Sequence, residues 1–93
     1  MFSSTVHIVT TNPGRLIRRL CKHWSHKFEV SFDDQQGSIA LGADHCQLTA
    51  GEGSLTAQIK SEDQTQLERL ETVVADHLQR MSSEETFTFD WQR

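Results

Sequence analysis

The chain has 93 residues, the size of one small domain, and 35% of them are hydrophobic, which is typical of a globular rather than a disordered protein. No run approaches the ~18 apolar residues of a membrane span, and the start of the chain lacks the features of a signal peptide, so we expect no membrane association and a cytoplasmic location. The net charge of −4 combines +5 in residues 1–27 with −9 in residues 28–93, and an acidic chain with one basic segment excludes a broad nucleic-acid-binding surface.

The first elements along the chain are predicted to be a strand and a helix. Residues 3–10 alternate, with Val6 and Ile8 on one face, which indicates a β-strand. Asn12-Pro13 then resembles a helix cap followed by proline at the first helical position, and the helix is expected to run to about His26. Its apolar stripe consists of Leu16, Ile17, Leu20, Cys21 and Trp24.

The middle of the chain predicts four short strands. Residues 28–60 alternate between apolar and polar side chains, with turns at residues 33–37, near Gly42 and at residues 51–53. One face of these strands is apolar and the other is polar. This pattern favours an antiparallel meander that buries one face and exposes the other.

A second helix and a last strand complete the predicted fold. Residues 61–64 resemble a capping box before a helix that reaches Arg80 or Met81, and residues 86–91 alternate strongly. The predicted order is β-α-β-β-β-β-α-β, as one α+β domain over residues 1–93. Because each helix has one apolar stripe, we expect a two-layer sandwich with both helices on one face of an antiparallel-rich sheet.

The first helix carries the strongest candidate for a binding surface. Its basic row and its end comprise Arg15, Arg19, Lys22, His23, His26 and Lys27. Such a row suits an anionic small molecule or an acidic protein surface, including that of a second copy in a homodimer. The alternative interpretation is a basic face that contacts only water.

Metal and thiol chemistry are less specific predictions. His23 and His26 are i,i+3 neighbours that could share a metal ion, although a stable site needs further ligands, for which His45 and Cys46 are the nearest candidates. Cys21, Cys46 and His77 are all expected to face inward, and in a reducing cytoplasm both cysteines are expected to be free thiols. Their convergence would make a soft metal site or a reactive thiol pair; otherwise the cysteines act as small hydrophobic residues and His77 bonds a polar neighbour.

Several motifs together resemble a bacterial family, the domain of unknown function 2218 family. The family pattern has a leucine and a His-aromatic-any-His-Lys segment, then a glycine and a cysteine before a Leu-Thr-Ala strand, then His-Leu-any-Arg and a final tryptophan. The matching residues are Leu20, His23, Trp24, His26, Lys27, Gly42, Cys46, Leu48, Thr49, Ala50, His77, Leu78, Arg80 and Trp91. Met81 departs from the pattern, since an aromatic residue is more usual there.

The resemblance implies no established activity, no cofactor and no assigned site residues. It does imply a likeness to a domain found fused to siderophore-interacting flavin reductases, and therefore a link to bacterial iron handling. The leading hypothesis is a non-enzymatic binding or accessory module that takes an anionic ligand such as an iron chelate. The alternatives are a metal- or thiol-dependent enzyme using His23, His26, Cys21 or Cys46, and a structural protein-interaction domain.

Overall fold

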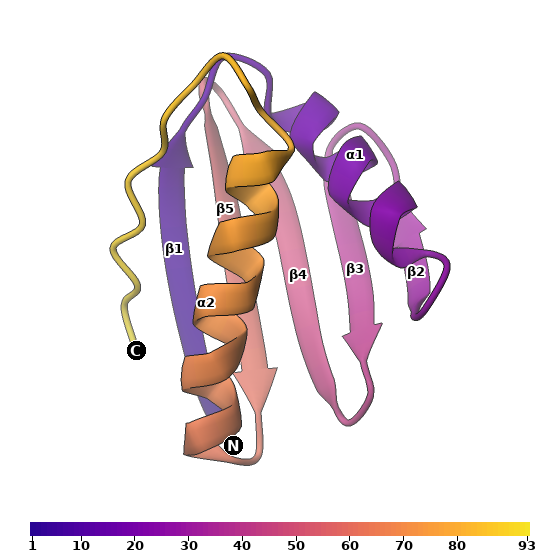
Figure 1. The fold of residues 1–93 in the computed structure, drawn as a ribbon, viewed down its shortest axis with the longest axis vertical. Helices are drawn as coiled ribbons and strands as arrows, with labels where there is room; N and C mark the ends of the chain where they lie inside the picture. The colour runs from indigo at the N-terminus through magenta and orange to yellow at the C-terminus, as the bar shows by residue number, and fades with distance from the viewer.

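A computed structural model describes residues 1–93 and shows a five-stranded antiparallel sheet covered on one face by two helices (Figure 1). The elements in chain order are β1 (Phe2–Val9), α1 (Pro13–Trp24), β2 (Glu29–Phe32), β3 (Gln36–Leu41), β4 (Asp44–Gly51), β5 (Ser54–Ser61) and α2 (Gln64–Arg80). The predicted α+β class and the placement of both helices on one face are confirmed. Neither helix combines the length and the apolar content that crossing a membrane requires.

The strands follow the order β1-β5-β4-β3-β2, and every neighbouring pair is antiparallel. Strands β2 to β5 form the predicted meander, and β5 then pairs with β1 along its whole length. Two glycines make the tight connections, because Gly42 and Gly53 have φ angles of 70° and 69°, a region that favours glycine. The N-terminal strand β1 thus lies at the edge of the sheet next to β5, the last strand of the meander.

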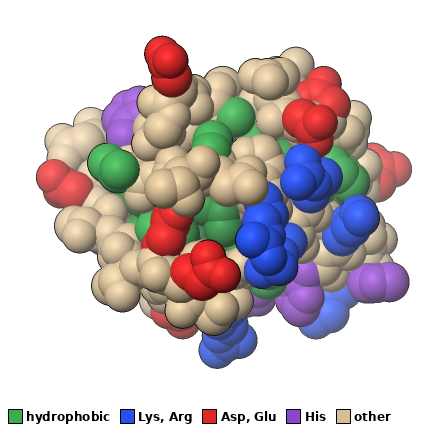
Figure 2. Space-filling model, turned by 90° about the horizontal axis from the view of Figure 1, so that it is seen from above, with side chains coloured by type: hydrophobic (Ala, Val, Ile, Leu, Met, Phe, Trp, Pro, Cys, Tyr) green, Lys and Arg blue, Asp and Glu red, His purple; other side chains and the backbone are tan.

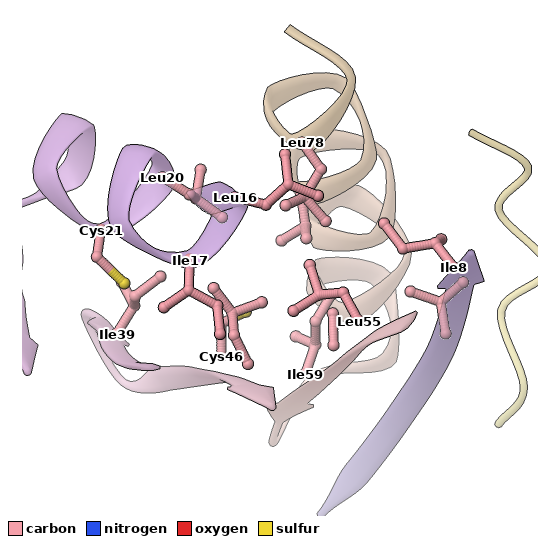
Figure 3. Close-up of a cluster of buried hydrophobic side chains, with 14 of the residues drawn as sticks. Ile8, Leu16, Ile17, Leu20, Cys21, Ile39, Cys46, Leu55, Ile59 and Leu78 are labelled. Carbon is pink, nitrogen blue, oxygen red and sulfur yellow. The ribbon is translucent and has the colours of Figure 1, made fainter. Parts of the chain in front are cut away.

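The hydrophobic core lies between the sheet and the two helices, and 18 buried side chains form one cluster there. Figure 3 shows Ile17, Leu20 and Cys21 of α1 above Ile39 and Cys46 of the sheet, and Leu78 of α2 close to Leu16. The alternation predicted from the sequence explains this arrangement, since Cys46 and Leu48 are fully buried while Thr49 is exposed. The other face of the sheet carries polar side chains such as Gln47 and Thr49, and no helix covers it (Figure 1).

The predicted last strand at residues 86–91 is wrong. Phe87 packs into the core and Phe89 and Trp91 pack against it, as the alternation predicted, but only one isolated bridge, between Thr5 and Gln92, joins this segment to β1. Earlier in the segment, the backbone groups bond the side chain of Gln79 and not a strand. The N–H of Phe87 donates to its Oε1, and the carbonyl of Glu85 accepts from its Nε2. The segment therefore lies beside β1 without forming a regular ladder (Figure 1).

The predicted capping box at residues 61–64 is also wrong. Asp63 is the N-cap of α2, and its carboxylate accepts hydrogen bonds from the backbone N–H groups of Thr65 and Gln66. The Ser61 hydroxyl bonds the backbone of Asp63 itself. A carboxylate at the cap also suits the positive end of the helix dipole.

Candidate functional site

The start of α1 is organised as predicted. The side chain of Asn12 accepts a hydrogen bond from the backbone N–H of Arg15 at 3.2 Å, and Pro13 occupies the first helical position. The helix ends at Trp24 instead of His26, and in the turn that follows Lys27 and Phe28 both donate their backbone N–H to the carbonyl of Trp24. His26 and Lys27 therefore lie in the turn that follows the helix.

The basic side chains of the predicted site are exposed and lack carboxylate partners. Three salt bridges occur in the chain, and they join Arg18 to Asp34 and Arg93 to Glu68 and Glu71. Arg18 is the one base in residues 1–27 that is neutralised in this way. The four that remain are Arg15, Arg19, Lys22 and Lys27, and all four are exposed.

These side chains form a stripe along one face of α1. At 100° per residue, Arg15, Arg19 and Lys22 fall within roughly 60° of arc, and His26 follows in the turn after the helix. With a rise of 1.5 Å per residue, the three helical residues span about 10 Å along the helix axis. Figure 2 shows Lys and Arg side chains gathered on the α1 side of the upper end of the molecule, with His side chains below them. We call the residues Arg15, Arg19, Lys22 and His26 the basic stripe.

A small notch lies beside the basic stripe, where the start of α1 meets the end of α2. Arg19 crosses it and donates a hydrogen bond from Nη1 to the carbonyl of Met81 at 2.8 Å. The notch measures about 50 Å³, room for a few water molecules. Two carboxylates also line it, so it is too small and too mixed in charge to enclose an anionic ligand.

One of those carboxylates is held ionised at the notch. Glu85 accepts hydrogen bonds from the hydroxyl and the backbone N–H of Thr11, at 2.7 and 3.0 Å. These bonds hold the pKa of Glu85 below its usual range, and the bond from the Thr11 hydroxyl has the largest effect. An anion is therefore better accommodated on the outward side of the basic stripe than in the notch.

The histidines are arranged differently from the predicted metal site. His23 lies beside His77 of α2, with ring centroids 5.5 Å apart, and His77 also lies 5.0 Å from the ring of Trp24. His45 is on the uncovered face of the sheet, where its Nε2 bonds the hydroxyl of Ser38 at 2.6 Å, so it cannot join His23 and His26. No group of three or more His, Cys, Asp or Glu side chains is placed to hold a metal ion.

The two cysteines, Cys21 on the inner face of α1 and Cys46 in β4 beneath it, are fully buried. Burial raises the pKa of Cys21 to about 11, and burial together with the nearby Cys21 raises that of Cys46 to about 12. At neutral pH both are protonated, whereas the thiolate is the nucleophile and the metal ligand. His77 contacts Trp24 and His23, so no catalytic or metal-binding trio of Cys21, Cys46 and His77 is supported.

The approach of His23 to His77 is the feature that sequence reasoning missed. Both residues lie near the C-terminal end of their helix, but 54 positions separate them in the chain. The helical pattern placed His23 at the boundary of the apolar stripe of α1 and His77 inside that of α2. Those positions predict two residues near a helix–helix seam, yet only the packing of α1 against α2 shows that they meet.

Comparisons with known proteins agree with the motifs. A family model described as "Uncharacterized protein conserved in bacteria (DUF2218)" matches residues 5–92. The NMR structure of PA4090 from Pseudomonas aeruginosa is 42% identical, with a TM-score of 0.84, covering 99% of this chain and 96% of that one. No curated protein matches the chain. The match over nearly the whole length confirms the resemblance, and the chain belongs to this bacterial family of uncharacterized proteins.

Proposed function

We propose that the protein is a non-catalytic binding module that holds a multiply charged anionic ligand on α1. The observation that carries this proposal is the basic stripe, in which the exposed bases Arg15, Arg19 and Lys22 follow one another along one face of α1 without a carboxylate partner. Lys27 lies beside the stripe and enlarges the positive surface. Arginine is well suited to carboxylate groups, because its guanidinium can donate two parallel hydrogen bonds.

The shape of this surface favours a ligand with several anionic groups. The adjoining notch is too small to enclose a molecule, so affinity has to come from contacts spread along α1. An anionic iron chelate of the siderophore type has this multivalent character. We choose this ligand because the sequence resemblance leads us to expect a likeness to a domain fused to siderophore-interacting flavin reductases.

The test uses ferric citrate, an anionic and paramagnetic iron chelate, added to isotopically labelled protein. Binding on the basic stripe is expected to broaden the amide NMR signals of α1 more than those of β1 and β5. The double variant Arg15→Glu, Arg19→Glu should lose this selective broadening. Arg69→Glu is the matched control, because Arg69 is an exposed base on α2 outside the stripe. Uniform broadening at millimolar chelate, with or without the substitutions, would refute the proposal.

A second candidate ligand is an acidic protein surface, including that of another copy of this chain. It is favoured by the exposed position of the basic stripe along one helix and by the net charge of −9 on residues 28–93, which offers acidic surface to a second copy. Exposed ion pairs weaken as salt screens them. Sedimentation velocity should then show self-association at low salt that disappears at high salt and in the Arg15→Glu, Arg19→Glu variant. A monomer at low salt would exclude the homodimer.

A further inference from the structure

The seam between α1 and α2 brings two imidazoles from distant parts of the chain together. The ring centroids of His23 and His77 are 5.5 Å apart, and their planes are tilted by 50°. His23 is exposed, whereas His77 is half-buried against the ring of Trp24. One imidazole is therefore free to rotate, and the other is held by its surroundings.

The orientation of His77 also defines which nitrogen is available. Its Nδ1 lies 2.8 Å from the backbone carbonyl oxygen of Val73. A carbonyl oxygen can only accept, so Nδ1 carries the proton and Nε2 of the neutral ring keeps its lone pair. Metal-binding histidines commonly donate their other ring N–H to a backbone carbonyl in this way.

The spacing of the two rings suits a shared metal ion. Two imidazoles bound at about 2.0–2.1 Å to one tetrahedral ion have ring centroids about 5.2 Å apart. The separation of 5.5 Å between His23 and His77 is close to that value. We propose that His23 and His77 form a site for a divalent transition metal ion that spans α1 and α2.

The chemistry of the pair defines the class of metal and the character of the site. Imidazole nitrogen favours Cu²⁺, Ni²⁺ and Zn²⁺, with Cu²⁺ bound most tightly in a site of given ligands. No third His, Cys, Asp or Glu side chain completes the coordination. Water or an external ligand fills the other positions, and the metal exchanges readily. His26 has no part in this site, which distinguishes it from the pair predicted within one helical turn.

The experiment uses protein without a histidine tag and in a Trp91→Phe background, so that Trp24 is the sole fluorophore. The ring of Trp24 lies 5.0 Å from that of His77, so Cu²⁺ bound by His77 should quench the fluorescence of Trp24. His23→Ala should weaken the apparent affinity for Cu²⁺ by about tenfold or more, by analogy with the loss of other coordination contacts. His77→Gln should have the same effect, and His26→Ala should have little.

The outcomes separate this site from its alternatives. His23 and His26 are both exposed, so neither substitution should disturb folding, and the melting temperature with and without Zn²⁺ checks the result in protein that keeps Trp91. An unchanged affinity in His23→Ala would overturn the proposal. An equal loss in His23→Ala and His26→Ala, with none in His77→Gln, would overturn it in favour of a site within the turn. Arg15→Glu, Arg19→Glu should retain the metal, which separates this test from that of the anion-binding function.

Discussion

Gly37 shows how one residue allows α1 to approach the sheet. A Cβ atom at this position in β3 would lie 2.8 Å from Sγ of Cys21 and 3.0 Å from Cγ2 of Ile17. Both neighbours are fully buried and have no room to move away. Gly37→Ala should therefore lower the free energy of unfolding, measured in urea, by about 1–3 kcal/mol, the usual cost of overpacking a core.

Two further variants test this cause. Gly51→Ala is the matched control, since its Cβ would closely meet only the hydroxyl of Ser54, which can rotate. Adding Cys21→Ala to Gly37→Ala removes the nearest clashing atom, so the two substitutions should be less than additive. Equal losses in Gly37→Ala and Gly51→Ala would mean that close helix packing is not the reason for this glycine.

The buried thiols carry a second prediction at the scale of single residues. Because the pKa values of Cys21 and Cys46 are raised to about 11 and about 12, we expect neither to react with iodoacetamide in native protein at mildly alkaline pH. Both should react once urea unfolds the chain. Mass spectrometry counts the modified thiols, and rapid modification of protein whose circular dichroism is native would contradict the prediction.

The same thiols give a stability change of defined sign. Their pKa is higher in the folded chain than the ordinary value of 9.0, so an unfolded chain loses these protons first as pH rises. Their contribution to stability is complete below pH 9.0 and is lost as pH rises through about 11 for Cys21 and about 12 for Cys46. The free energy of unfolding should fall less steeply over this range in Cys21→Ala than in the parent protein.

At the scale of elements, ionic contacts hold the C-terminal segment in place. Glu71 of α2 accepts hydrogen bonds from two nitrogens of Arg93 and from the fully buried hydroxyl of Ser4. The hydrogen bonds to Arg93 are the largest cause of the lowered pKa of Glu71, and Ser4 adds to them against the effect of burial. This contribution to stability is present above the ordinary pKa of 4.5 and is lost as pH falls below it.

Removing Arg93 tests the role of these contacts. In Arg93→Ala the pKa of Glu71 should rise, so the midpoint of acid unfolding should move to higher pH. Fluorescence of Trp91, two residues away, should also report a looser segment in a Trp24→Phe background. Arg69→Ala removes an exposed base from α2, the helix of Glu71, and should change neither the acid-unfolding midpoint nor the Trp91 fluorescence. A shift of equal size in the two variants would point to net charge instead of these contacts.

The helices and the last segment show what a periodic pattern can predict about an element. Leu16, Leu20 and Trp24 follow a helical period, and they are buried on the inner face of α1 as predicted. The alternation of Phe87, Phe89 and Trp91 predicted that their side chains face inward, and they do pack on the core. Their backbone did not become a strand, because alternation predicts which side chains are buried and not which backbone groups pair.

At the scale of the whole molecule, the class and layers of the fold were predictable, whereas the partners of distant elements were not. One apolar stripe per helix and one apolar face per strand leave two layers as the simple arrangement. Nothing local in β1 shows that it pairs with β5, since Val6 and Ile8 would suit either edge of the sheet. The pairing of His23 with His77 depends on the same long-range packing and was therefore missed.

The two faces of the sheet give the last prediction, which concerns the whole architecture. Gln47 and Leu48 are neighbours in β4, but Gln47 lies on the uncovered face, between Ser38 and Gln58, and Leu48 is fully buried beneath the helices. Leu48→Ala should cost about 2–5 kcal/mol of unfolding free energy, because it leaves a cavity in the core. Gln47→Glu should change it by about 0.5 kcal/mol or less, as for a surface position. Urea unfolding of both variants measures the difference, and a large loss in Gln47→Glu that depends on protein concentration would show that another molecule covers this face.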